Sequence, residues 1–177
     1  WSSDVCSSDL IPQGLLGAEF KKDPSGFFQI TRILPGRNWD KALRSPLTEV
    51  GINARVGDFL MAINGQSTKE MPNLFQALVN TVGKQVSLKL NTKPEEAGAR
   101  EVLVTPIGSE AKLYYYDWVD TNVRKVAAAS DNRVGYLHVP DMLAEGLNEF
   151  VKYYYPQLRK DALIIDMRGN GGGNVSP

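Results

Sequence analysis

The last part of the chain holds the residues whose types and spacing best suit chemistry. A largely apolar run, residues 162–167, breaks abruptly into Arg168-Gly169-Asn170-Gly171-Gly172-Gly173. Because glycine has no Cβ, the backbone N–H groups of such a loop are open to close approach by a ligand oxygen. A glycine-rich loop after a strand can therefore hold a phosphate, stabilise an oxyanion or simply allow close packing of the chain.

The surrounding residues favour the oxyanion function over the phosphate function. No Gly-x-x-x-x-Gly-Lys-Ser/Thr pattern is present, and no helix is visible after the glycines. A backbone N–H at this place would stabilise negative charge that develops on a reacting carbonyl oxygen. Close packing of the chain remains the alternative role of the loop.

Several side chains near this loop are candidates for chemistry, and each also has a simpler structural role. His138 is the only histidine and lies inside an expected strand, so we expect it to be packed rather than to act as a base. Asp166 and Arg168 predict an ion pair or hydrogen bonds to loop amides. Ser176 has no visible activating base and is expected to be a loop or helix-start serine. Asn170 is a candidate for orienting the loop through its side chain.

The pattern of residues 133–177 predicts a strand, a helix and a second strand. Residues 134–139 and 162–167 predict the strands, the second one covered on both faces because it is almost wholly apolar. The helix between them has one apolar face, formed by Leu143, Leu147, Phe150, Val151, Tyr154 and Leu158. This order predicts a right-handed parallel βαβ unit. Since one such unit cannot bury both faces of its sheet, we expect the rest of its domain beyond Pro177.

Residues 11–108 predict a small separate domain of short strands and two short helices. The strands are expected at 26–33, 59–63, 86–90 and 100–106, and the helices at 45–51 and 73–82. The dipeptide Asn64-Gly65 is a strong signal for a tight turn. Apolar side chains at near-helical spacing in residues 109–130 predict a helix that connects this domain to the βαβ unit.

The composition excludes several classes of protein. The chain has 177 residues, of which 42% are apolar, and no stretch approaches the length of a membrane span. Its 20 basic and 20 acidic residues cancel, so charge gives no argument for binding nucleic acid or an anionic membrane.

Residues 1–10 have neither helical nor strand periodicity and lack the features of a signal peptide. They resemble a translated sequencing adaptor, with a flexible native tail as the alternative, so we expect native sequence from about Ile11. Leaving out Asp4 and Asp9 reduces the 20 acids to 18 and gives a formal charge of +2. Cys6, the only cysteine, lies in this tail, so the native part offers no disulfide framework, thiol nucleophile or cysteine metal site.

Two motifs in residues 11–108 resemble a PDZ domain of the bacterial, protease-associated kind. They are Ser45-Pro46-(x)4-Gly51 and Val56-Gly57-Asp58-(x)4-Ala62-Ile63-Asn64-Gly65. Gly14, Leu15, Leu16 and Gly17 stand where such domains place their carboxylate-binding loop, and from Ala18 onward a bound peptide would add as a strand. The alternative is that Gly14 and Gly17 only shape a turn.

The order of elements over the whole native part resembles the tricorn branch of the C-terminal-processing-type serine peptidases. The residues that carry this resemblance are Gly135-Tyr136-(x)-His138-(x)-Pro140 and Ile164-Ile165-Asp166-Met167-Arg168-Gly169-Asn170-Gly171-Gly172-Gly173. The implied fold is mixed α and β, a PDZ-like β-barrel-type domain followed by the first βαβ unit of a crotonase-like α/β core. The expected divisions are a non-native tail at 1–10, a PDZ-like domain at 11–108, a connecting helix at 109–132 and the start of the peptidase core at 133–177.

The resemblance implies a serine endopeptidase that acts through an acyl-enzyme. It implies that a backbone N–H from among Gly171, Gly172 and Gly173 helps form the oxyanion hole. The nucleophile and base of the family would lie outside residues 11–177, so the chain by itself is expected to be inactive. The resemblance further implies peptide or unfolded-protein substrates, no metal or organic cofactor, a homo-hexamer, and a cytoplasmic location with a periplasmic one as the alternative.

Two other functions stay open at this point. The runner-up within the enzyme class is a C-terminal processing peptidase that uses a Ser-Lys pair. The chain can also be read as a non-catalytic, PDZ-containing scaffold that keeps the fold but lacks the nucleophile.

Overall fold

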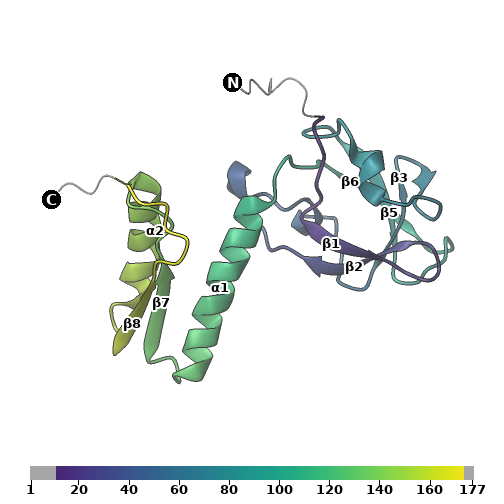
Figure 1. Cartoon of the computed structure of the whole chain (residues 1–177). Helices are drawn as coiled ribbons and strands as arrows, with labels where there is room; N and C mark the ends of the chain where they lie inside the picture. Colours follow the sequence, from purple (N-terminus) through teal and green to yellow (C-terminus); the bar gives the residue numbers. More distant parts are fainter. Residues whose placement is uncertain (1–10, 174–177) are drawn as a thin grey trace, which may run out of the picture. The chain divides into compact units, whose positions relative to one another are not determined.

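The computed structural model describes residues 11–173, and the chain divides into two compact units between Tyr114 and Tyr115 (Figure 1). The expected non-native tail, residues 1–10 with Cys6, lies outside the described residues, and so does Ser176.

The first unit is built around an antiparallel sheet (Figure 1). Its strand order is β1-β2-β3-β5-β6, and the short β4 pairs with β3. Its strands are β1 (Ala18–Lys22), β2 (Phe28–Ile33), β3 (Phe59–Ile63), β4 (Gln66–Ser67), β5 (Val86–Asn91) and β6 (Arg100–Val104). In β5, Val86, Leu88 and Leu90 are buried and alternate with half-buried Ser87 and Lys89, as the sequence predicts for a half-buried strand. The mixed fold with a PDZ-like antiparallel sheet is confirmed.

The two short helices of this unit are smaller than predicted. The helix expected at 73–82 is a single 3₁₀ segment, Leu74–Leu78. The side chain of Asn73 caps its N-terminus by accepting a hydrogen bond from the N–H of Phe75. Beyond it the backbone turns away, because Val79 forms an isolated bridge with Gln13. The prediction that the helix continues to Val82 is wrong, since pairing with the start of the domain competes successfully with the next helical turn.

The helix expected at 45–51 is likewise one 3₁₀ segment, Pro46–Thr48. Ser45 precedes it as predicted, but its hydroxyl donates to the carbonyl of Leu34 at 2.7 Å instead of capping the helix. Ser45 therefore joins this helix to the end of β2.

The second unit contains a parallel βαβ arrangement, as predicted (Figure 1). Helix α1 (Ala111–Ala129) leads into β7 (Val134–His138), which is followed by α2 (Ala144–Tyr154), a 3₁₀ turn at Tyr155–Gln157, and β8 (Ala162–Asp166). Strands β7 and β8 are parallel, in a register that pairs His138 with Asp166. The last residues of both strands therefore meet at one edge of the sheet, directly before the glycine loop.

The apolar face of α2 exists but is mostly exposed among the described residues. Leu147 is 63% exposed, whereas Glu149 on the other side of the helix is buried. Glu149 accepts a hydrogen bond from the hydroxyl of Tyr116 at 2.7 Å, so a polar contact lies on the inside. Ile165 of β8 is 50% exposed, so residues 11–173 do not cover both faces of β8, as expected of a single βαβ unit. Two strands and one helix supply too little surface for that.

Candidate functional site

The glycine loop after β8 is held in place by the side chain of Asn170. The Nδ2 group of Asn170 donates to the carbonyl of Val139 at 2.9 Å, and its Oδ1 accepts from the N–H of Gly172 at 2.8 Å. The first contact ties the loop to the residue after β7, and the second fixes the curvature of the loop itself. The predicted role of Asn170 in orienting the loop is confirmed.

Backbone hydrogen bonds join the loop to the segment after β7. The N–H of Gly171 donates to the carbonyl of Pro140 at 2.9 Å, and the carbonyl of Gly172 accepts from the N–H of Met142 at 2.8 Å. Two of the three candidate oxyanion donors, Gly171 and Gly172, thus already have acceptors inside the protein. For the N–H of Gly173, residues 11–173 provide no hydrogen-bond acceptor.

Gly173 also occupies a place where only glycine fits. A Cβ at this position would lie 2.7 Å from the backbone carbon of Met142, and its φ is 151°. At Gly171, in contrast, a Cβ would meet no atom within 4 Å. The requirement for glycine is therefore strongest at the residue whose N–H is left available.

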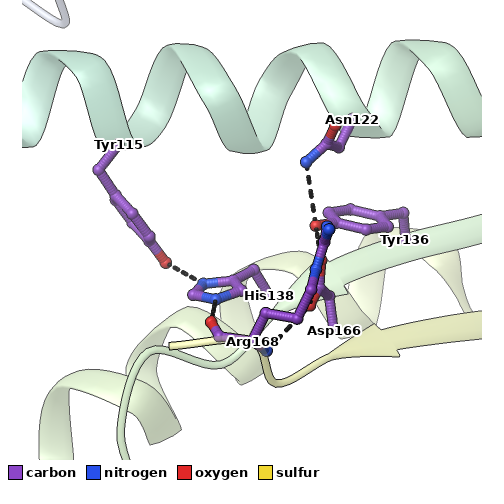
Figure 2. Close-up of polar contacts among 6 residues, drawn as sticks. All are labelled: Tyr115, Asn122, Tyr136, His138, Asp166 and Arg168. Atoms are coloured by element: carbon purple, nitrogen blue, oxygen red, sulfur yellow. Dashed lines mark hydrogen bonds and ion pairs between the residues drawn. The ribbon is translucent and has the colours of Figure 1, made fainter. Parts of the chain in front are cut away.

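The residue that opens the loop, Arg168, is fixed by Asp166 at the end of β8 (Figure 2). The Asp166 carboxylate accepts from the backbone N–H and Nε of Arg168, each at 3.0 Å, and from its Nη2 at 2.5 Å. It also accepts from the hydroxyl of Tyr136 at 2.6 Å, and that hydroxyl accepts from Asn122 at 3.1 Å. These contacts, above all those from the Arg168 side chain, hold the pKa of Asp166 well below its usual range. The predicted ion pair and amide contact are both confirmed.

His138, at the end of β7, fixes the other side of Arg168 (Figure 2). Its Nε2 lies 2.8 Å from the carbonyl oxygen of Arg168, and its Nδ1 lies 3.1 Å from the hydroxyl of Tyr115. A carbonyl oxygen can only accept, so Nε2 carries the proton, and in the neutral ring Nδ1 accepts from Tyr115. The ring is buried and meets Trp118 edge to face at 4.9 Å. Both nitrogens are occupied, so His138 is a packed histidine, as predicted, and not a free base.

Sequence reasoning missed Tyr115 and Tyr136 as members of this network. A signal for Tyr136 was present, because Tyr136 and His138 are two residues apart in a strand and so lie on the same face. No local signal marks Tyr115, which reaches the network from α1 (Figure 2).

The predicted carboxylate-binding loop of the first unit has its own set of contacts. The N–H of Gly14 donates to the carbonyl of Leu78 at 2.9 Å, and that of Leu15 to the carbonyl of Ile107 at 2.8 Å. Leu16 is fully buried in the core, so its side chain packs and does not face a ligand. These three residues place the loop, and the residues that follow them in the chain are Gly17 and Ala18.

The N–H of Gly17 already holds a carboxylate, because it donates to Oε1 of Glu110 at 2.7 Å. The φ of Gly17 is 74°, a left-handed conformation typical of loops that present N–H groups to an anion. Sequence reasoning missed Glu110, which lies 93 residues from Gly17 and shows no local signal of this contact.

Within residues 11–173, no cluster of three or more His, Cys, Asp or Glu side chains is arranged to hold a metal ion. No helix in the same range has the length and apolar character to cross a membrane.

The described residues thus combine an antiparallel sheet that carries an amide loop with a parallel βαβ unit that ends in an anchored glycine loop. Residues 14–109 match the family model described as the tricorn protease PDZ domain, and residues 133–177 match the model for peptidase family S41. The first match covers more than half of the chain. The chain therefore belongs to the tricorn protease family.

Individual relatives agree with this assignment. Tricorn protease homolog 1 of Streptomyces coelicolor is 36% identical over 93% of this chain and 15% of its own length. The tricorn protease homolog of Saccharolobus solfataricus is 35% identical over 98% of this chain and 16% of its own length. A crystal structure of the tricorn protease superposes with a TM-score of 0.82 at 28% identity, over 93% of this chain and 16% of that one. The chain thus spans about 15% of the length of the curated relatives that it matches.

Proposed function

We propose that this chain is part of a tricorn-type serine peptidase and supplies one backbone donor of its oxyanion hole. The observation that supports this most is the hydrogen bonding of the glycine loop. Asn170, Pro140 and Met142 anchor the loop, and its third glycine, Gly173, keeps an N–H without an acceptor among residues 11–173. We assign the donor to Gly173.

In peptide hydrolysis through an acyl-enzyme, negative charge develops on the carbonyl oxygen of the bond that is cleaved. A donor that is already in position stabilises this charge without reorganising, and one such donor contributes about 3 kcal/mol. Asp166 and His138 prepare that position, because they fix the N–H and the carbonyl of Arg168 at the start of the loop. In this proposal neither residue reacts.

The nucleophile and its base come from outside residues 11–177, so the chain alone is inactive in this proposal. We further propose that the PDZ unit positions peptides or unfolded proteins as substrates. By the family resemblance, the whole protein assembles as a homo-hexamer, acts in the cytoplasm and needs no metal or organic cofactor.

The experiment begins with the source gene, read in both directions beyond the codons for this chain. The product is expressed, treated with a fluorophosphonate that labels activated serines, and assayed on a fluorogenic peptide. The 177-residue chain receives the same treatment as a control and is expected to remain unlabelled. A labelled serine downstream of residue 177 and a histidine upstream of the PDZ unit support the proposal. A downstream Ser-Lys pair without the histidine replaces it with a C-terminal processing peptidase. No labelling and no hydrolysis overturn it and leave a peptide-binding scaffold.

A further inference from the structure

The amide loop of the PDZ unit is filled by a side chain of the same unit. The Glu110 carboxylate accepts from the N–H of Gly17 at 2.7 Å. By the PDZ resemblance, the terminal carboxylate of a bound peptide would lie at this loop. A ligand carboxylate and the Glu110 carboxylate cannot occupy this position together, because both carry the same charge and need the same donors.

The chemistry of the contact makes it exchangeable. Glu110 is held by neutral amides, and burial raises its pKa above the usual value, while the amides of Gly17 and Ala18 act in the opposite direction. The nearby Glu19 carboxylate raises that pKa further. Removing the Glu110 charge from water therefore costs free energy, and this cost offsets part of the free energy that the hydrogen bond contributes.

Glu110 can also leave without disrupting the backbone. Its carbonyl accepts from the N–H of Tyr114 at 3.0 Å, in the first turn of α1, and this bond does not involve the side chain. Rotation about the side-chain bonds is therefore enough to free the amides, and such rotations are fast.

The neighbouring strand suits a peptide. Strand β1 begins at Ala18, stands first in the sheet order and pairs on one side with β2. An extended peptide that places its carboxylate on Gly17 and Ala18 would run along the other edge of β1 by strand addition.

We propose that Glu110 is an internal competitor for the terminal carboxylate of a peptide and keeps the loop closed until such a ligand displaces it. The ligand class is an extended peptide with a free C-terminus. This inference concerns binding by the first unit and does not depend on the catalytic proposal, so either can fail while the other stands.

The size of the effect follows from the fraction of molecules in which the loop is open. The apparent dissociation constant is the intrinsic one divided by that fraction. If Glu110 fills the loop in about nine molecules of ten, removing it tightens carboxylate binding about tenfold.

The test uses the 177-residue chain labelled with ¹⁵N, and it follows the amide signals of Gly17 and Ala18. The probes are sodium acetate and N-acetyl-tetra-alanine with a free carboxylate, and the controls are acetamide and the amidated peptide. The variants are Glu110→Ala and, as the matched control, Glu70→Ala, since Glu70 is exposed and lies in a turn. We expect Glu110→Ala to bind both carboxylates at least about tenfold more tightly than the wild type and Glu70→Ala.

Two results would overturn the proposal. One is equal affinity in the wild type and Glu110→Ala, which means that Glu110 does not compete. The other is no carboxylate-dependent shift in Glu110→Ala, which means that the loop binds no external carboxylate. If Glu110→Ala fails to fold, Glu110→Gln decides, because it keeps an acceptor oxygen without the charge. It is expected to bind the probes more tightly than the wild type, and no gain in that variant also overturns the proposal.

Discussion

The chain contains two loops built to present backbone N–H groups, Gly14–Ala18 in the first unit and Gly169–Gly173 in the second. In the first loop, the N–H of Gly17 already donates to the Glu110 carboxylate. In the second loop, the N–H groups of Gly171 and Gly172 donate to acceptors within the protein, while the N–H of Gly173 has no acceptor within residues 11–173. The number of glycines in a loop therefore does not show whether it can bind an anion. That depends on whether each N–H already has an acceptor in the protein.

The two loops also differ in what holds them. The first is anchored by apolar packing, with Leu16 fully buried in the core of the sheet domain. The second is anchored by polar contacts, through Asn170 inside the loop and through Asp166 and His138 at its start. Substitutions should consequently damage the first loop through lost packing and the second through lost hydrogen bonds.

The largest expected effect is on the packing of the first loop. Leu16→Ala removes a fully buried side chain and leaves a cavity, so it should lower the free energy of unfolding of the first unit by about 3 kcal/mol. Urea denaturation followed by amide signals of β3 and β5 measures this. Leu15→Ala is the control, since Leu15 is only half-buried. Equal losses for the two variants would contradict the view that packing at Leu16 anchors this loop. Because Leu16 is fully buried, Leu16→Asp would place a charge in the core, so this variant would report on folding and not on peptide binding.

The next effect concerns the donor of the second loop. In the full-length enzyme, Gly173→Ala should reduce kcat about a hundredfold with little change in KM, because its Cβ would lie 2.7 Å from the backbone of Met142 and displace the N–H. Steady-state hydrolysis of a fluorogenic peptide measures both constants. At Gly171 a Cβ meets nothing within 4 Å, so Gly171→Ala should cost far less. If Gly171→Ala lowered kcat more than Gly173→Ala, the oxyanion donor would be assigned to Gly171.

A smaller effect is expected where the polar network supports that loop. Tyr136→Phe removes the donor that lies 2.6 Å from Asp166 and should lower the stability of the second unit by about 1.5 kcal/mol. Hydrogen exchange of the β7 amides reports this. Tyr154→Phe, which changes a hydroxyl that makes no hydrogen bond within residues 11–173, serves as the control. If both variants exchange alike, the contact between Tyr136 and Asp166 does not stabilise the unit.

The smallest effect is a dependence on pH that separates the two loops. The pKa of Asp166 is lower in the folded state than its unfolded value of about 3.9, so its stabilising contribution is present above that pH and is lost as the pH falls further. The second unit should therefore lose stability below about pH 4, by at most about 1.4 kcal/mol per pH unit from this group. Asp166→Asn should flatten this slope.

The slope is read from urea denaturation at several pH values, followed by amide signals of the second unit. Glu110 in the first loop has the opposite sign, because its pKa is raised, so its contribution falls as the pH rises above the unfolded value of about 4.3. If Asp166→Asn still loses stability as the pH falls below about 4, the loss arises from other carboxylates.

The sequence determined the local elements and their order. Alternation in residues 86–90 predicted β5, and the Asn64-Gly65 signal gave a turn in which both residues adopt positive φ. The strand–helix–strand pattern after residue 133 predicted the parallel pair β7 and β8. These features depend on side chains close together in the chain, and periodicity and turn chemistry express them directly.

Tertiary structure alone decided which polar groups meet. Glu110 reaches Gly17 across 93 residues, and Tyr115 reaches His138 across 23. The same cause shortened the helix after Asn73, where pairing of Val79 with Gln13 replaced a helical turn. A hydrogen bond between distant residues depends on how whole elements pack, and neither partner carries a local mark of the other. The sequence thus located both amide loops, and only the folded chain decided that one holds its own carboxylate while the other leaves the N–H of Gly173 available.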